Sequence, residues 1–384
     1  MFKFFKILVL LLLNFLCLVS IVQSSENKIR IGLLVPLTGE NSEMGYQIVK
    51  STRIALKEIN SNSLEIYPRD TGSDPNKTLR SALELKNLGA KIIIGPVFYK
   101  NLQYLEEIQD LIFVSLTNKT INLPKNVISS GVNASSQLNT IKKFIELNNI
   151  EKTIFLTPKL DYENEIKKAI KKSKINIHKH YLYDKEPTKL TAQIEKITNY
   201  KIRKQNLLDE IKRVEESNLA DKENQLEKLK KRYTLGNVNF DSVIISDFDE
   251  SLKSVITSLL YTDVSPQKKF IITFNQWFDK SLLRENAIQP IYYPSINKKN
   301  LEDFEKKFFQ EFEEYPNYLS LLSYDLVGLI YYLSLRNEFD DIEKLFKKKN
   351  SFKGKIGIFN IKDNKINHQL NLYQVQDGKL KEIF

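Results

Sequence analysis

Few residues of this 384-residue chain have the types and spacing that catalysis requires. The sequence contains no Gly-x-Ser-x-Gly turn, no Gly-x-x-x-x-Gly-Lys loop and no Gly-x-Gly-x-x-Gly motif. His178 and His180 alternate along a segment of strand character, and solvated positions explain them better than a metal pair that lacks further ligands. Carboxylate pairs such as Asp161 with Glu163 are common in a chain with 47 acidic residues. We therefore expect no enzyme, no metal site and no cofactor.

Other residues have types that suit binding. Asn41 or Ser42 is placed to cap a helix, and a helix N-terminus offers free N–H groups and a partial positive charge to an anion. Plain capping with no ligand is the alternative. Trp277 lies between aromatic neighbours in the sequence, so we expect it to pack in the core or in a cleft wall rather than to form a cation-binding cage.

Alternating strands and helices must position these residues. Apolar runs with strand character cover residues 30–35, 64–67, 91–95, 111–115, 153–156, 241–246 and 269–274, and helical spacing covers 44–60, 102–108 and 162–172. The alternation predicts an α/β fold with right-handed βαβ units on parallel sheets. Parallel sheets bind ligands beyond the carboxyl ends of their strands, so the turns at 36–42, 95–101 and 115–118 should meet at one cleft.

Chain length predicts the number of lobes, and the net charge bears on the kind of partner. A chain of 384 residues exceeds what one hydrophobic core usually serves, so two lobes are expected. The formal net charge of +11 comes with a general excess of Lys, Asn and Ile, and no Arg-rich, aromatic-interleaved patch is present. We expect no nucleic-acid partner, and weak attraction to an anionic envelope polymer is the alternative use of the charge.

The N-terminus has the features of an export signal. A basic start precedes the apolar run over residues 7–22, which is short for a membrane span, and small residues follow. We expect a signal peptide over residues 1–24 that is cleaved rather than kept as an anchor. Cys17 lies inside this leader behind the bulky Phe15 and Leu16, so no lipid attachment is expected there. Without Cys17 the exported chain has no disulfide.

Residues 188–233 depart from the strand and helix alternation. They contain no Gly or Pro, and their apolar residues keep a three-four spacing among many charges. The pattern predicts a long amphipathic helix, or a helical hairpin that turns near Ser217-Asn218. The segment either packs on its own lobe with a solvated outer face or protrudes to meet a partner protein.

Several motifs in order along the chain resemble a known family. They are Ile31-Gly-Leu-Leu-Val-Pro-Leu-Thr-Gly39, Ile94-Gly-Pro96, Tyr324-Asp325 opening a helix, Lys353-Gly-Lys-Ile-Gly-Ile-Phe359 and Asp377-Gly-Lys. From about residue 28 to the end the chain resembles the type I periplasmic solute-binding proteins, the leucine-binding class. Residues 188–229 with 234–247 are similar to the branch called penicillin-binding protein activators.

The resemblance implies two Rossmann-like lobes joined by a three-strand hinge. Lobe 1 would comprise residues 27–133 and 290–363. Lobe 2 would comprise residues 134–289 and 364–384, with the helical insertion 188–233. The first crossing is expected after Ser129-Ser130-Gly131 and the second near Pro290 to Pro294.

The resemblance also implies where a ligand would bind. In leucine-binding members, a Ser-rich turn after the third strand and a Ser/Ala/Thr turn after the fourth hold the amino acid. The first turn here, Val97-Phe-Tyr-Lys100, has no serine, whereas the second keeps Ser115 and Thr117. Tyr162 matches a second-lobe tyrosine, although Glu163 replaces the glycine that follows it. The candidate cleft residues are Ser42, Tyr99, Lys100, Ser115, Thr117, Tyr162 and Trp277, with Lys100 suited to pair with an anionic group and Tyr99 to stack on one.

Two functions follow from the resemblance. The first is a periplasmic regulator that docks on a peptidoglycan synthase, a penicillin-binding protein, through its surface. The alternative is the substrate-binding protein of an ABC importer, with a permease as partner and an amino acid or another small polar solute as ligand. The same scaffold serves both, because fold does not determine function.

Overall fold

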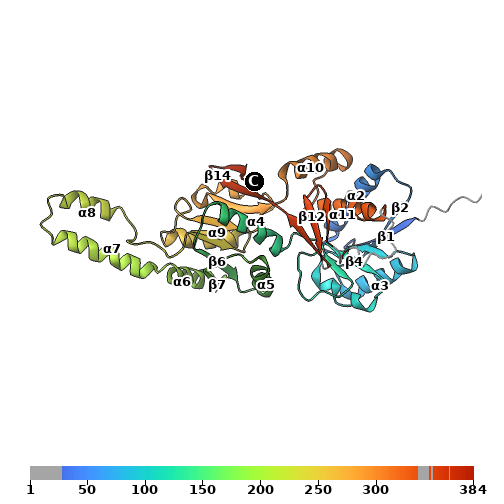
Figure 1. The fold of residues 1–384 in the computed structure, drawn as a ribbon, viewed down its shortest axis with the longest axis horizontal. Coiled ribbons are helices and arrows are strands. Elements are labelled where there is room, and N and C mark those ends of the chain that lie inside the picture. Colours follow the sequence, from blue (N-terminus) through green and yellow to red (C-terminus); the bar gives the residue numbers. More distant parts are fainter. Residues whose placement is uncertain (1–27, 336–345, 347–348, 363) are drawn as a thin grey trace, which may run out of the picture.

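Two sheets organise the chain, and the computed structural model describes residues 28–335, 346, 349–362 and 364–384 (Figure 1). The expected signal peptide, with Cys17, lies outside these residues. Within the described ranges, no helix combines the length and the apolar character needed to cross a membrane.

The first sheet has eight strands in the order β11-β12-β13-β5-β4-β3-β1-β2. Its parallel part contains β1 (Ile29–Val35), β2 (Leu64–Asp70), β3 (Ile92–Ile94), β4 (Ile112–Ser115) and β5 (Val127–Ser129). The strands β11 (Asn350–Lys353), β12 (Ile358–Lys362) and β13 (Lys365–Gln369) pair antiparallel with each other, and β13 joins β5. The described part of this lobe includes the helices α2 (Ser42–Ile59), α3 (Pro75–Asn87), α10 (Lys298–Phe312) and α11 (Tyr318–Ser334).

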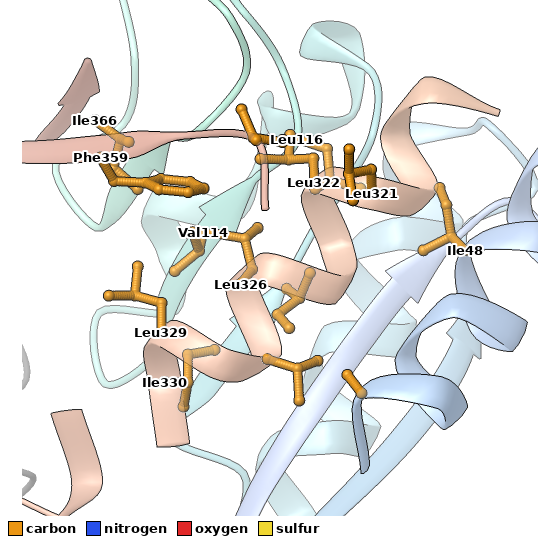
Figure 2. Packing of buried hydrophobic residues seen from close by; sticks show 14 of the residues in the cluster. Ile48, Val114, Leu116, Leu321, Leu322, Leu326, Leu329, Ile330, Phe359 and Ile366 are labelled. Carbon is orange, nitrogen blue, oxygen red and sulfur yellow. The ribbon is translucent and has the colours of Figure 1, made fainter. Parts of the chain in front are cut away.

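The apolar run in β1 is continuous because helices cover both faces of the sheet. Ile31, Leu33 and Val35 pack on one side with α2 and α11, while Leu34 packs on the other with α3. Helix α11 is apolar around most of its circumference and is correspondingly buried. Figure 2 shows Leu326 of α11 close to Val114 of β4 within this cluster.

The second sheet has seven strands in the order β15-β14-β10-β9-β8-β6-β7. The strands are β6 (Thr153–Pro158), β7 (Lys179–Tyr183), β8 (Ser242–Ile245), β9 (Phe270–Thr273), β10 (Ile291–Ser295), β14 (Asn371–Gln376) and β15 (Lys379–Glu382). Helices α4 (Ala134–Leu147) and α5 (Glu163–Ser173) cover one face, and α6 (Pro187–Ile197) and α9 (Asp249–Tyr261) cover the other. The predicted α/β fold with two lobes is therefore confirmed.

The chain crosses between the sheets three times, but two crossings come later than expected. The first follows β5, as the sequence predicts. We expected lobe 1 to resume at residue 290 and to end at 363, yet β10 pairs with β9 and β14, and β13 pairs with β12 and β5. The strand β10 continues through Pro294 because its pairing with β9 ends at Tyr292. On the side of β10 that faces β9, residue 294 therefore needs no backbone N–H, which proline lacks.

Two predicted helical segments also differ from the structure. Residues 102–108 form no continuous helix; two short 3₁₀ turns, η1 (Tyr99–Leu102) and η2 (Leu105–Glu107), occupy the region. The insertion is shorter than 188–233, because Leu190 and Ile194 of α6 are buried in the core of the second lobe. Only α7 (Tyr200–Glu215) and α8 (Lys222–Lys230) leave the lobe, as a hairpin that turns at the predicted Ser217-Asn218 (Figure 1).

Candidate functional site

A loop between β4 and β5 brings the two lobes into contact beside two adjoining cavities. The smaller cavity, of about 200 Å³, has walls from both lobes: Tyr99, Lys119, Ile121 and Asn122 from the first, and Asp161, Tyr162, Asn164 and Glu165 from the second. The larger one, of about 400 Å³, shares Ile121 and Asn122 with it. The loop residue Thr120 donates its N–H to Glu165 Oε2 (3.0 Å), so the lobes are linked directly at this point.

Tyr99 and Tyr162 are the two predicted site residues that the structure places together. The Tyr99 hydroxyl donates to the Asn122 carbonyl (3.1 Å), and the Lys119 ammonium lies 4.4 Å from the centre of its ring. The Tyr162 hydroxyl donates to the Ser246 carbonyl (2.9 Å), and burial together with Asp247 raises the pKa of this phenol. Both tyrosines form walls of the smaller cavity. Lys119 was not identified from the sequence, since nothing in its local pattern marks it.

Ser115 and Thr117 form hydrogen bonds with backbone groups of their own turns. Ser115 Oγ is fully buried, donates to the Pro96 carbonyl (2.8 Å) and accepts the Thr117 N–H (3.3 Å). Thr117 Oγ1 accepts the Lys119 N–H (3.3 Å), and Thr117 is itself buried. Neither residue lines the two cavities. The hydroxyls that resemble half of an amino-acid clamp stabilise their own turns.

The remaining predicted residues lie apart from the cavities. Lys100 is exposed and lines neither of them. Ser42 is the first residue of α2, and the expected side-chain cap is absent there, because Asn41 directs its amide to Ser73 Oγ (3.2 Å). Trp277 packs against the core of the first lobe, where its ring stacks on Tyr318 at 4.7 Å.

Trp277 forms the second direct link between the lobes. Its backbone carbonyl accepts a hydrogen bond from the Tyr318 hydroxyl (2.8 Å). Its φ of 48° lies in the left-handed region, which residues other than glycine rarely adopt. The N–H of Trp277 donates to Asn275 Oδ1 (2.8 Å), which holds this turn after β9. Together with the hydrogen bond between Thr120 and Glu165, this contact joins the lobes directly.

A third cavity, of about 470 Å³, lies in the first lobe beside Tyr324 and Asp325. These residues were expected to open a helix, but they lie in the second turn of α11. The Asp325 carboxylate accepts the N–H groups of Lys355 and Ile356, both at 2.7 Å, and burial raises its pKa to about 7. This carboxylate ties the β11–β12 hairpin to α11, so its role is structural. In the described part of the chain, no group of three or more His, Cys, Asp or Glu residues is arranged to hold a metal ion.

Comparison with known proteins agrees with this geometry. The family model described as "Periplasmic binding protein" matches residues 28–200, and no curated protein matches the sequence. The C-domain of LpoA (YraM) from Haemophilus influenzae, a regulator of PBP1A, superposes with a TM-score of 0.60 at 14% identity, over 92% of this chain and 100% of that one.

Amino-acid-binding proteins superpose to a similar degree. LivJ from Streptococcus pneumoniae, solved with isoleucine, has a TM-score of 0.53 at 16% identity over 92% of this chain and 98% of that one. The leucine-binding protein LivK from Thermotoga maritima has a TM-score of 0.56 at 14% identity over 93% and 98%. At these identities the likeness concerns the fold. The sequence thus matches the periplasmic binding protein family over residues 28–200, and its two lobes together have the type I fold of that family.

Proposed function

We propose that the protein works in the periplasm as a regulator that contacts a peptidoglycan synthase, a penicillin-binding protein, and that it carries no amino acid. The observation that carries this proposal is the state of the turns that would hold an amino acid. The turn from Val97 to Lys100 contains no serine, and the hydroxyls of Ser115 and Thr117 form hydrogen bonds with backbone groups. A buried hydroxyl that already has its partners gains little from a ligand.

The α7–α8 hairpin supplies a surface for such contact. Arg203 at its base is only 4% exposed, and its guanidinium donates to Thr234 Oγ1 and to the Thr262 carbonyl, both at 2.8 Å. Asp263 lies 3.9 Å from the same group, and the Arg203 carbonyl accepts the Leu235 N–H (2.9 Å). Both ends of the hairpin are therefore fixed to the second lobe. A preorganised projection loses less conformational freedom on binding than a disordered one.

The hairpin is also self-supporting. Leu207 and Val214 are buried along α7, whereas α8 has no fully buried residue and exposes charged side chains. Residues such as Ile202 (63% exposed) and Tyr233 (77% exposed) are apolar groups left in solvent. The likeness of the fold to the C-domain of LpoA, a regulator of PBP1A, is consistent with the proposal.

The test is capture of a penicillin-binding protein from detergent-solubilised envelopes by the immobilised exported protein. Bound synthases are identified by covalent labelling with fluorescent penicillin. The matched variant replaces residues 209–228 with a short Gly/Ser linker, which keeps Arg203 and Thr234. We expect a labelled band with the wild type and its loss with the shortened variant, at an unchanged melting temperature. No labelled band with the wild type would refute the proposal.

The second candidate is a solute-binding protein of an ABC importer. The cavity between Tyr99 and Tyr162 favours it, since a site between two lobes is where such proteins hold a ligand. A ligand at 100 times its dissociation constant stabilises the native state by about 2.7 kcal/mol. A rise in melting temperature with leucine, isoleucine or another small polar solute would favour this second function.

A further inference from the structure

The larger of the two cavities between the lobes is lined by basic side chains from distant parts of the chain. Lys168 and Lys172 come from α5 of the second lobe, and Lys365 comes from β13 of the first. The remaining lining residues are Thr120, Ile121, Asn122, Ser135 and Ala169. The lining residues that the structure describes thus contribute three ammonium groups and no carboxylate to a cavity of about 400 Å³.

Two of these lysines have no acidic partner among the described residues. Among the residues that the structure describes, neither Lys168 nor Lys365 forms an ion pair, whereas Lys167 on the same helix pairs with Glu163. The adjoining cavity has two acids, Asp161 and Glu165, and Glu165 accepts hydrogen bonds from the Thr120 N–H (3.0 Å) and hydroxyl. Like charges held in one cavity from two lobes repel each other, and an anion between them would offset that repulsion.

Hydrogen-bond donors complete the cavity. Ser135, which is 5% exposed, lies in the first turn of α4, a helix of 14 residues whose N-terminal N–H groups carry a partial positive charge. The Asn133 side chain caps this helix by accepting the Ser136 N–H (2.9 Å), so the turn is held in place. Lysine binds phosphate and carboxylate as a point charge, without the planar geometry that arginine imposes.

We propose that this cavity binds a small anion with two or more negative charges, such as a phosphate ester, a pyrophosphate or a di- or tricarboxylate. The site is separate from the turns at Ser115 and Thr117 and from the α7–α8 hairpin. An anion seated there would contact both lobes, and so it would strengthen the link that Thr120 and Glu165 already make. The inference does not depend on the proposed contact with a synthase.

The test uses isothermal titration calorimetry of the exported protein with pyrophosphate and with citrate as probes, at low and at high salt. The double variant Lys168→Gln with Lys365→Gln removes one ammonium from each lobe. The control, Lys171→Gln with Lys379→Gln, makes the same change in net charge at exposed positions that line none of the three cavities described above.

We expect saturable binding of at least one probe near one site per chain, weakened at high salt. The cavity variant should lose at least tenfold in affinity, which corresponds to about 1.4 kcal/mol or more, while the control stays within about twofold. Absence of binding by both probes would overturn the proposal. Equal losses in both variants, or binding only of long polyanions, would overturn it too, because both indicate a general surface charge effect.

Discussion

The substitution Gly354→Ala should destabilise the first lobe because the space at this glycine is filled by a buried carboxylate. A Cβ at residue 354 would lie 2.4 Å from Asp325 Oδ2, 2.6 Å from its Cγ and 2.8 Å from Phe359 Cε2. The carboxylate is held by two N–H groups at 2.7 Å, so it cannot move away without loss. Hydrogen bonds to charged groups contribute about 1.5–3 kcal/mol each, and we expect a loss of roughly 3 kcal/mol in the free energy of unfolding.

The matched control is Gly328→Ala on α11, where a Cβ would meet Phe352 Cζ at an ordinary 3.6 Å. Ala is favoured over Gly inside a helix by about 0.5–1 kcal/mol, so this variant should be equal to the wild type or more stable. Urea denaturation followed by circular dichroism measures both. Opposite signs support the role of Asp325 as the tie between α11 and the β11–β12 hairpin. An unchanged midpoint for Gly354→Ala, or equal losses in both variants, would refute the reasoning.

Three further predictions concern other parts of the fold. The pKa of Asp325 in the folded state is about 7, above that of an unfolded Asp, so the folded state binds this proton more tightly. This contribution to stability is present at low pH and is lost as pH rises from about 4 to 7. Asp325→Asn should therefore flatten that part of the plot of urea midpoint against pH. Arg203→Met should remove the hydrogen bond to Thr234 and loosen the base of the hairpin, so limited proteolysis should cut within residues 200–233 several-fold faster. The control Arg213→Met changes an exposed side chain of the same helix and should leave the cleavage rate unchanged. Leu326→Ala, fully buried in the core that Figure 2 shows, should cost about 2–5 kcal/mol in urea denaturation.

Much of the fold could be predicted from the sequence because its signals are local. The apolar run before Val35 and the Pro at the start of α3 each determine an element by themselves. Membership of β10 and β13 in their sheets could not be predicted, since it depends on which distant strand offers an open edge. The same holds for α6, whose pattern does not distinguish a helix on the lobe from a helix in the hairpin.

The site was predictable only in part. The sequence shows that no serine lies between Val97 and Lys100. Whether the Ser115 hydroxyl donates to the Pro96 carbonyl depends on the backbone geometry of that turn, which the sequence does not show. The lysine-lined cavity combines residues 168 and 172 of the second lobe with residue 365 of the first. No spacing rule connects positions that far apart.

The most direct measurement of the central claim is the binding isotherm between the exported protein and the penicillin-binding protein that it captures, with and without the hairpin residues 209–228. We expect saturable binding by the wild type that is weakened at least tenfold in the shortened variant, with no effect of added leucine or isoleucine. Equal affinity of the two proteins would contradict the role of the α7–α8 hairpin. No binding to any penicillin-binding protein, together with a melting shift caused by an amino acid, would contradict the proposed function as a whole.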